Sequence, residues 1–241
     1  MVSISPRTLI FLIKLTMSEL KFYEYSDSKN PKYLVIFLHG YGANGENLIH
    51  LSYEFKHVLP EAHFIAPNAI EPWEGGFPHA YQWFSLGNGI ERKGLVEMAA
   101  TIKNANKILE NFIDAQLTRF NLPAEKLFLV GFSQGAMMSI YQGLIAPKKP
   151  AGIISFSGRL ILPQALGEEI LSKPEICLIH GEADSVLPFT HFIEAKKLLT
   201  AQKISHEAHS FPHLDHSIDI HGVRVAQNFI KKITQQNLEQ I

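Results

Sequence analysis

The chain has 241 residues, of which 46% are hydrophobic and 19% are charged, a composition typical of one globular domain with a sizeable core. Its 22 basic and 23 acidic residues nearly balance, so no basic excess exists to neutralise phosphates, and nucleic-acid binding is disfavoured. The single cysteine, Cys177, excludes an intrachain disulfide and a cysteine-rich zinc site. This cysteine usage indicates a reducing compartment, and we expect a cytoplasmic protein.

The first residues carry the one candidate targeting signal. The apolar run at 9–13 ends at Lys14 and is shorter than the roughly 7–15 residues of a signal-peptide core. No run reaches the about 18 apolar residues that span a bilayer. Met17 leads directly into the first strand-like segment, so translation from Met17 would leave 1–16 out of the natural chain. We interpret 1–16 as an N-terminal extension and expect 17–241 to form a single domain.

Strand-like runs alternate with helical patterns along the chain. In chain order, the patterns predict a weak strand at 20–25, a buried strand at 33–38, a helix at 45–58, a strand at 63–66, a helix at 93–120, a strand at 127–130, a helix at 134–145, strands at 152–156 and 176–179, a helix at 191–201, a strand at 204–211 and a closing helix at 217–234. Such alternation favours an α/β fold, with a mostly parallel central sheet covered by helices on both faces.

The connection at 68–92 is too long for a plain turn, and long loops in compact domains are usually functional. It holds both tryptophans of the protein, Trp73 and Trp83, together with Phe77 and Phe84. We predict that these four aromatic residues line a substrate pocket. The alternative is a loop that is simply packed down by its own aromatic side chains.

The pentapeptide at 131–135 fits the pattern G-x-S-x-G, with Ser133 at its centre. It follows a predicted strand and opens a predicted helix, which is the setting of a nucleophile elbow. Glycines flank the serine because the sharp turn brings its neighbours together, where side chains would clash. An ordinary Gly-Ser turn is the alternative, and the strand–turn–helix context disfavours it.

A serine nucleophile needs a base that is held by a third group. In α/β-hydrolases the acid and then the histidine follow the serine along the chain. Asp184 lies just beyond the predicted strand at 176–179, where an open α/β sheet collects its site. Glu182 is the competing acid, whereas Asp215 adjoins the candidate bases too closely to orient one from the side.

The chain has 12 histidines, so the base is harder to choose. His213 and His216 both lie in the loop ahead of the closing helix, and the pattern alone leaves either as the base. The spacings His206-x-x-His209 and His213-x-x-His216 also raise the alternative of a metal cluster. Zinc sites of known type use other spacings and a dedicated acid or cysteine, so we expect no metal.

Three glycines fall within six residues at 40–45, directly after the predicted strand at 33–38. Backbone N–H groups of such a loop suit an oxyanion. A phosphate-binding loop is the alternative, but the Gly-Lys-Ser/Thr ending and the third glycine of a dinucleotide fingerprint are both missing. We therefore expect no nucleotide cofactor.

At these residues the sequence resembles the phospholipase/carboxylesterase family of α/β-hydrolases, which includes acyl-protein thioesterases and small bacterial carboxylesterases. The resemblance covers about 33–229 and rests on a set of short motifs. These are Leu-His-Gly-Tyr-Gly at 38–42, Ala-Pro-Asn at 66–68, Trp-Phe at 83–84, Gly-Phe-Ser-Gln-Gly at 131–135, His-Gly-Glu-Ala-Asp and Val-Leu-Pro within 180–188, and Asp-His-Ser-Ile at 215–218.

The resemblance implies an α/β-hydrolase fold and a triad of Ser133 as nucleophile, Asp184 as orienting acid and His216 as base. It also implies that the backbone N–H groups of Tyr41 and Gln134 form the oxyanion hole. No metal or cofactor is implied. Two departures weaken any transfer of protein-depalmitoylating specificity: Ser85 stands where the thioesterase branch usually has aspartate, and His213-Leu214-Asp215 stands where the family commonly has glycine before the base.

These observations predict a serine carboxylesterase that hydrolyses esters of short-to-medium acyl chains through an acyl-enzyme. The alternative activity is that of a thioesterase or lysophospholipase acting on acylated protein or lipid. A second alternative is an inactive hydrolase-like protein that binds a ligand or partner. The expected partner is a small-molecule ester or acylated substrate, with no nucleic acid and no transmembrane segment, and the pattern leaves monomer and homodimer open.

Overall fold

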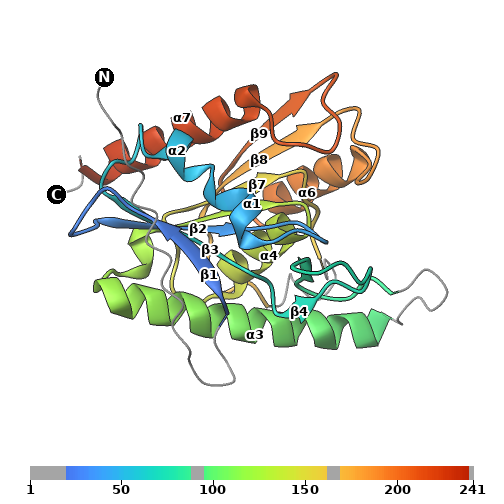
Figure 1. Cartoon of the computed structure of the whole chain (residues 1–241). Helices are drawn as coiled ribbons and strands as arrows, with labels where there is room; N and C mark the ends of the chain where they lie inside the picture. The colour runs from blue at the N-terminus through green and yellow to red at the C-terminus, as the bar shows by residue number, and fades with distance from the viewer. Residues whose placement is uncertain (1–19, 88–94, 162–168, 239–241) are drawn as a thin grey trace, which may run out of the picture.

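The computed structural model describes residues 20–87, 95–161 and 169–238 (Figure 1). The predicted extension at 1–16, residues 88–92 of the aromatic loop and the first two residues of the helix predicted at 93–120 lie outside the described residues. The strands are β1 (Phe22–Tyr25), β2 (Tyr33–Leu38), β3 (Ala62–Pro67), β4 (Glu71–Pro72), β5 (Tyr81–Gln82), β6 (Leu127–Phe132), β7 (Gly152–Phe156), β8 (Glu175–Gly181) and β9 (His206–Phe211). The helices are α1 (Gly45–Ile49), α2 (Ser52–Phe55), α3 (Leu95–Phe120), a short 3₁₀ turn η1 (Ala124–Lys126), α4 (Gln134–Ile145), α6 (Thr190–Ala201) and α7 (Ile220–Leu238).

Seven strands form one sheet in the order β1-β3-β2-β6-β7-β8-β9. Only β1 runs antiparallel to its neighbour, and the other five pairs of adjacent strands are parallel. The registers pair Leu38 with Gly131 and Gly181 with Phe211, so the carboxyl ends of β2, β6, β8 and β9 share one edge. This edge is where an open α/β sheet binds its ligands.

Alternating side chains of the central strands serve two separate cores because they point to opposite faces of the sheet. Leu129 of β6 packs with α3, α4 and α6 on one face. Phe128 and Val130 pack with α1, α2 and α7 on the other. In Figure 1, α3 and α7 accordingly lie on opposite sides of the sheet. The predicted mostly parallel sheet with helices on both faces is confirmed.

Two predicted segments differ from the observed structure by more than the position of their ends. The helix predicted at 45–58 is divided into α1 and α2, because i→i+3 bonds from Leu51 to Leu48 and from Tyr53 to His50 tighten the chain there. The long aromatic connection is not wholly irregular, since β4 and β5 pair as a two-stranded antiparallel sheet within it. An isolated bridge between Ala43 and Tyr81 attaches this small sheet to the loop after β2.

Candidate active site

Ser133 occupies the sharp turn between β6 and α4. Its backbone has φ 54° and ψ −117°, outside the regions that L residues favour. Such a conformation costs on the order of 1–3 kcal/mol and persists only where the surrounding structure enforces it. Here the Ser133 N–H donates to Phe156 O at 2.9 Å, and the Ser133 carbonyl accepts from Met137 N at 3.1 Å. The serine is thereby held at the carboxyl edge of the sheet, 8% exposed.

Sterics explain both glycines of the G-x-S-x-G pattern. A Cβ on Gly131 would lie 2.4 Å from the carbonyl carbon of Gly135. A Cβ on Gly135 would lie 1.9 Å from Leu38 O, in the backbone of β2. Backbone atoms cannot yield at these distances, so a side chain at either position would displace the turn. The predicted strand–turn–helix arrangement is therefore present.

Asp184 and His216 meet at the same edge of the sheet. His216 Nδ1 lies 2.8 Å from Asp184 Oδ2. Because an ionised carboxylate only accepts hydrogen bonds, Nδ1 carries the proton and Nε2 is left without one in the neutral ring. The Asp184 side chain is fully buried and that of His216 is 14% exposed, so one end of this pair faces the site opening.

The loop after β8 donates hydrogen bonds to the other carboxylate oxygen of Asp184. Asp184 Oδ1 accepts from Val186 N at 3.0 Å and from Leu187 N at 2.7 Å. Burial would raise the pKa of Asp184, but the hydrogen bonds from His216 and from these two N–H groups outweigh burial and hold the pKa below its usual value. Asp184 is therefore an anion at neutral pH and favours a proton on the facing His216 nitrogen.

The competing acids have other partners. Glu182 accepts from Ser210 Oγ at 2.7 Å. Asp215 Oδ1 accepts from Ser185 and from the backbone N–H of His216 itself, so it braces the loop and does not bond the imidazole. His213, the rival base, is exposed. The geometry thus pairs Asp184 with His216, as the resemblance implied.

His216 and the loop after β2 both lie beside the serine turn. The imidazole of His216 lies 4.8 Å, between ring centroids, from the ring of Phe132, the residue before Ser133. Gly40, in the loop after β2, also lies beside this turn, since a Cβ on Gly40 would be 3.3 Å from the Cβ of Ser133. The loop after β2, the serine turn and the histidine loop therefore converge at one point.

The loop after β2 is held by the small β4–β5 sheet. Gly42 N donates to Tyr81 O at 2.9 Å, and Tyr81 N donates to Ala43 O at 2.8 Å. These bonds fix the backbone around Tyr41. Gln134, whose N–H lies in the first turn of α4 and has no intrahelical acceptor, directly follows Ser133 in the chain. The two predicted oxyanion donors therefore belong to the two segments that flank the serine.

Trp83 and Phe84 support the segment that carries Gln134. Both side chains are fully buried in the core with α3 and α4. Trp83 N donates to the Gln134 side chain at 2.8 Å, and Gln134 Nε2 donates to Phe84 O at 2.7 Å. Trp83 Nε1 donates to His39 O at 2.9 Å. The sequence predicted that both rings line the substrate pocket. In the structure neither ring is exposed, and the two residues instead hold the side chain of Gln134.

Of the predicted aromatic wall, Phe77 is exposed and Trp73 is half-buried. Their rings stack with centroids 5.7 Å apart, and Phe77 is 70% exposed. Trp73 packs edge-on against Tyr41, with centroids 5.8 Å apart. This aromatic pair therefore lies beside the loop that flanks Ser133.

Two residues of the site carried no predicted role. His39 is fully buried, and burial lowers its pKa to about 4, so the ring is neutral. It accepts from Ala69 N at 2.9 Å through Nε2 and donates to Gly40 O at 2.7 Å through Nδ1. Glu74 accepts from the hydroxyl of Tyr41 and, at 2.5 Å, from that of Ser85. The signal for His39 was its place in the Leu-His-Gly-Tyr-Gly motif, whereas nothing local marked Glu74.

The spacing His206-x-x-His209 raised a metal cluster as an alternative. His206 and His209 are three apart on β9 and so point to opposite faces. Cys177, Glu207 and His209 place donor atoms within 4.8 Å of one another. However, Lys232 already donates to Glu207 at 2.6 Å, and burial raises the pKa of the Cys177 thiol. No helix in the described ranges is long and apolar enough to cross a membrane.

Comparisons with known proteins find related esterases and thioesterases. The crystal structure of esterase PE8 aligns with a TM-score of 0.83 and 35% identity, covering 89% of this chain and 99% of that chain. Acyl-protein thioesterase 1 of Neurospora crassa is 27% identical over 209 residues, 81% of this chain and 84% of that protein. Esterase YpfH of Escherichia coli is 26% identical over 209 residues, 86% of this chain and 85% of that protein.

The model of the family described as phospholipase/carboxylesterase matches residues 24–234, which is nearly the whole described structure. The α/β-hydrolase fold predicted from the sequence is confirmed by this match and by the esterase structure. Relatives named as esterases and as acyl-protein thioesterases both occur among the similar proteins. The chain therefore belongs to the phospholipase/carboxylesterase family of hydrolases.

Proposed function

We propose that this protein is a serine carboxylesterase in which Ser133, His216 and Asp184 act as a triad. The observation that carries the proposal is the 2.8 Å contact of His216 with Asp184 at the edge where Ser133 occupies its strained turn. A serine hydroxyl alone is a weak nucleophile, and a base oriented by a carboxylate is the usual means of activating it.

The chemistry follows from the tautomer that Asp184 imposes. With Nδ1 donating to the carboxylate, His216 Nε2 takes the proton of Ser133 Oγ as the oxygen attacks the acyl carbonyl carbon. The same proton then passes to the leaving alcohol, and an acyl-enzyme remains. His216 next removes a proton from water, which attacks the acyl group and releases the acid. Asp184 stabilises the imidazolium at each stage without taking its proton.

In this proposal, the N–H groups of Tyr41 and Gln134 stabilise the oxyanion of each tetrahedral intermediate. Preorganised donors of this kind contribute about 10²–10³ each to kcat. Their rigidity comes from the surrounding bonds: the Gln134 side chain is held by Trp83 and Phe84, and the Tyr41 loop by Tyr81. The donors therefore need no rearrangement when charge develops.

The acyl chain is proposed to lie against Trp73 and Phe77. Each buried methylene is worth about 0.8 kcal/mol, so kcat/KM should rise by up to about fourfold per added CH₂ until the wall is covered. The wall is a single stacked pair of rings beside the site, which favours short-to-medium chains.

Thioester hydrolysis is the second candidate, because the relative from Neurospora crassa is named an acyl-protein thioesterase. Ser85 bears on this choice. An aspartate there, as in the thioesterase branch, would place a second carboxylate against Glu74, which Ser85 now contacts at 2.5 Å. Like charges at that distance repel, so the surroundings of residue 85 suit serine and disfavour the aspartate of the thioesterase branch. We therefore favour the ester.

The two activities separate in one assay. Purified protein is given p-nitrophenyl butyrate and, in parallel, a butyryl thioester of the same chain length, with Ser133→Ala as the matched control. The proposal expects a higher kcat/KM on the ester and no turnover by the control. A higher kcat/KM on the thioester would select the second candidate, and no turnover of either would indicate an inactive hydrolase-like binding protein.

A further inference from the structure

His180, on β8, is a second histidine beside the buried carboxylate of Asp184. Its Nε2 lies 2.9 Å from Leu187 O and 3.4 Å from Asp184 Oδ2. The same Oδ2 is the oxygen that faces His216 Nδ1. Asp184 Oδ2 therefore lies between two imidazoles, one of which belongs to the proposed triad.

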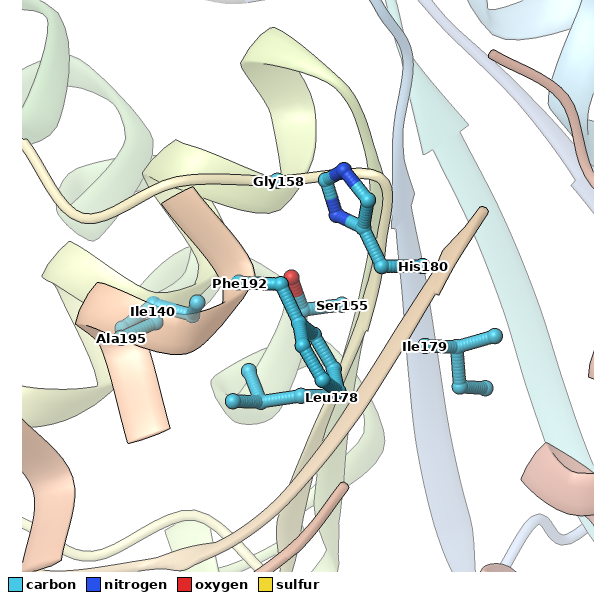
Figure 2. A pocket seen from close by; sticks show the side chains of 8 residues that line it. All are labelled: Ile140, Ser155, Gly158, Leu178, Ile179, His180, Phe192 and Ala195. Carbon is cyan, nitrogen blue, oxygen red and sulfur yellow. The ribbon is translucent and has the colours of Figure 1, made fainter. Parts of the chain in front are cut away.

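The ring of His180 is enclosed. It is 1% exposed and packs against Phe189 and Phe192 at centroid distances of 6.2 and 5.8 Å. Figure 2 shows it projecting from β8 toward Gly158, with Phe192 and Ser155 in the same pocket. A Cβ on Gly158 would lie 2.7 Å from both Ala136 Cβ and Ser155 Oγ, so this side of the pocket is filled to contact.

This enclosure determines the protonation of His180. Burial lowers its pKa, so the ring is neutral and carries one N–H. The titratable groups that act on it are Asp184, His216 and, from α6, His191. Both neighbours of Nε2, the carbonyl of Leu187 and the carboxylate, are acceptors only. The proton is therefore on Nε2, where a single N–H faces both oxygens.

Leu187 is held from two sides as a result. Its N–H donates to Asp184 Oδ1 at 2.7 Å, and its carbonyl accepts from His180 at 2.9 Å. The turn that carries Asp184 is thus closed back onto the strand from which it departs. We propose that His180 is a positioning residue, whose Nε2–H closes the Asp184 loop onto β8 and keeps Oδ2 directed at His216.

This inference rests on the proposed triad and adds a residue that does not touch substrate. Loss of the Nε2–H opens the loop at Leu187 and removes a donor from beside Oδ2. The carboxylate then holds the His216 proton more strongly. Turnover falls because Asp184 is less well oriented, and the acid limb of the kcat/KM profile moves to higher pH. Substrate binding is unchanged because His180 lies behind the acid.

The test compares His180→Phe, which keeps an aromatic ring against Phe189 and Phe192 but has no donor, with His180→Gln, whose amide N–H can occupy the place of Nε2. We expect His180→Phe to lower kcat about tenfold, the worth of one buried hydrogen bond, with KM within about twofold. We expect the acid limb of its kcat/KM profile to move to higher pH, and His180→Gln to recover most of both changes. His206→Gln, on β9, is the matched control.

A second measurement needs no variant to be active. In ¹⁵N-histidine-labelled wild-type protein, the His180 signal, assigned by its loss in His180→Gln, should show a protonated Nε2 and an unprotonated Nδ1 at about pH 7 to 8. A proton on Nδ1, or a charged ring in that range, would overturn the inference even if His180→Phe failed to fold.

The two proposals fail in different ways. If wild-type protein hydrolyses esters through Ser133 and His180→Phe folds with an unchanged kcat and pH profile, the inference alone is wrong. A fall in kcat without any movement of the pH limb would reduce His180 to a packing residue. If Ser133→Ala keeps the activity of the wild type, the triad itself is wrong.

Discussion

Replacing Asp184 by asparagine removes one charge while leaving the shape of the site in place. The amide oxygen can continue to accept from Val186 N and Leu187 N, which now donate to Oδ1. The amide nitrogen then takes the position of Oδ2, 2.8 Å from His216 Nδ1. Because an NH₂ group only donates, Nδ1 must become the acceptor, and the proton of the neutral ring moves to Nε2. In that tautomer Nε2 cannot take the proton of Ser133.

The size of the loss follows from this change of tautomer. Serine proteases in which the acid is made an amide lose about 10⁴ in kcat, equivalent to about 5.4 kcal/mol in the activation barrier. We expect a similar loss for Asp184→Asn, with KM little changed because Asp184 is buried behind the base. The fold should survive, because both backbone N–H groups keep an acceptor.

The assay is initial-rate hydrolysis of p-nitrophenyl butyrate, with circular dichroism melting to confirm the fold. Glu182→Gln and Asp215→Asn are the matched controls, since both change a nearby carboxylate to an amide, and both should keep at least about a tenth of kcat because neither bonds the imidazole. A folded Asp184→Asn variant with more than a tenth of the wild-type kcat would refute the reasoning. A loss of more than about tenfold in kcat for either control would also refute it.

Three further predictions concern the base, the acyl wall and acid stability. His216→Ala should lower kcat by about 10⁴ or more while the exposed His213→Ala keeps most activity, and the reverse ranking in the same ester assay would move the base to His213. Phe77→Ala should flatten the rise of kcat/KM from acetyl to octanoyl esters and spare acetyl esters, and an unchanged chain-length profile would remove Phe77 from the pocket. Burial would raise the pKa of Glu24, but hydrogen bonds from His63 and Arg119 lower it to about 2 from 4.5, so its stabilisation is present above about pH 4.5 and is lost as pH falls toward 2. Glu24→Gln should therefore lose about 2 kcal/mol in urea unfolding at pH 7 and much less at pH 3, and an equal loss at both would contradict the ionic origin.

The serine turn was predictable because its constraints are local in sequence. Three residues separate Gly131 from Gly135, and the clash that requires Gly131 arises within one strand–turn–helix unit. The apolar run before the turn and the helical pattern after it predicted a helix at 134–145, and α4 has these same limits, Gln134 to Ile145. Local sterics and periodicity were sufficient to place this turn.

The base was not decided by pattern because His213 and His216 share one loop. Which of them faces Asp184 depends on contacts from distant segments. Asp215 accepts from Ser185, thirty residues away, and from the N–H of His216, and these bonds hold the loop. The resemblance to the family supplied the choice that the residues alone left open, and the contact with Asp184 agrees with it.

The position of Trp83 could not be predicted from its loop. An aromatic residue in a glycine-rich connection can face a pocket or the core, and its sequence neighbours do not distinguish the two. Its indole donates to His39 O and its N–H to the side chain of Gln134, and both partners are distant in sequence. Long-range hydrogen bonds therefore decided its direction, and the same holds for the contact of Glu74 with Tyr41.

Covalent labelling tests the central claim most directly. Wild-type protein is treated with a fluorophosphonate at neutral pH, digested, and mapped by mass spectrometry, with Ser133→Ala and His216→Ala treated in parallel. The reagent reacts with a serine only where a base activates it and an oxyanion site stabilises the adduct. We predict one adduct, on Ser133, which is absent from the first variant and formed at a greatly reduced rate in the second. An adduct on another residue, or an active enzyme that carries none on Ser133, would contradict the assignment of Ser133 as the nucleophile.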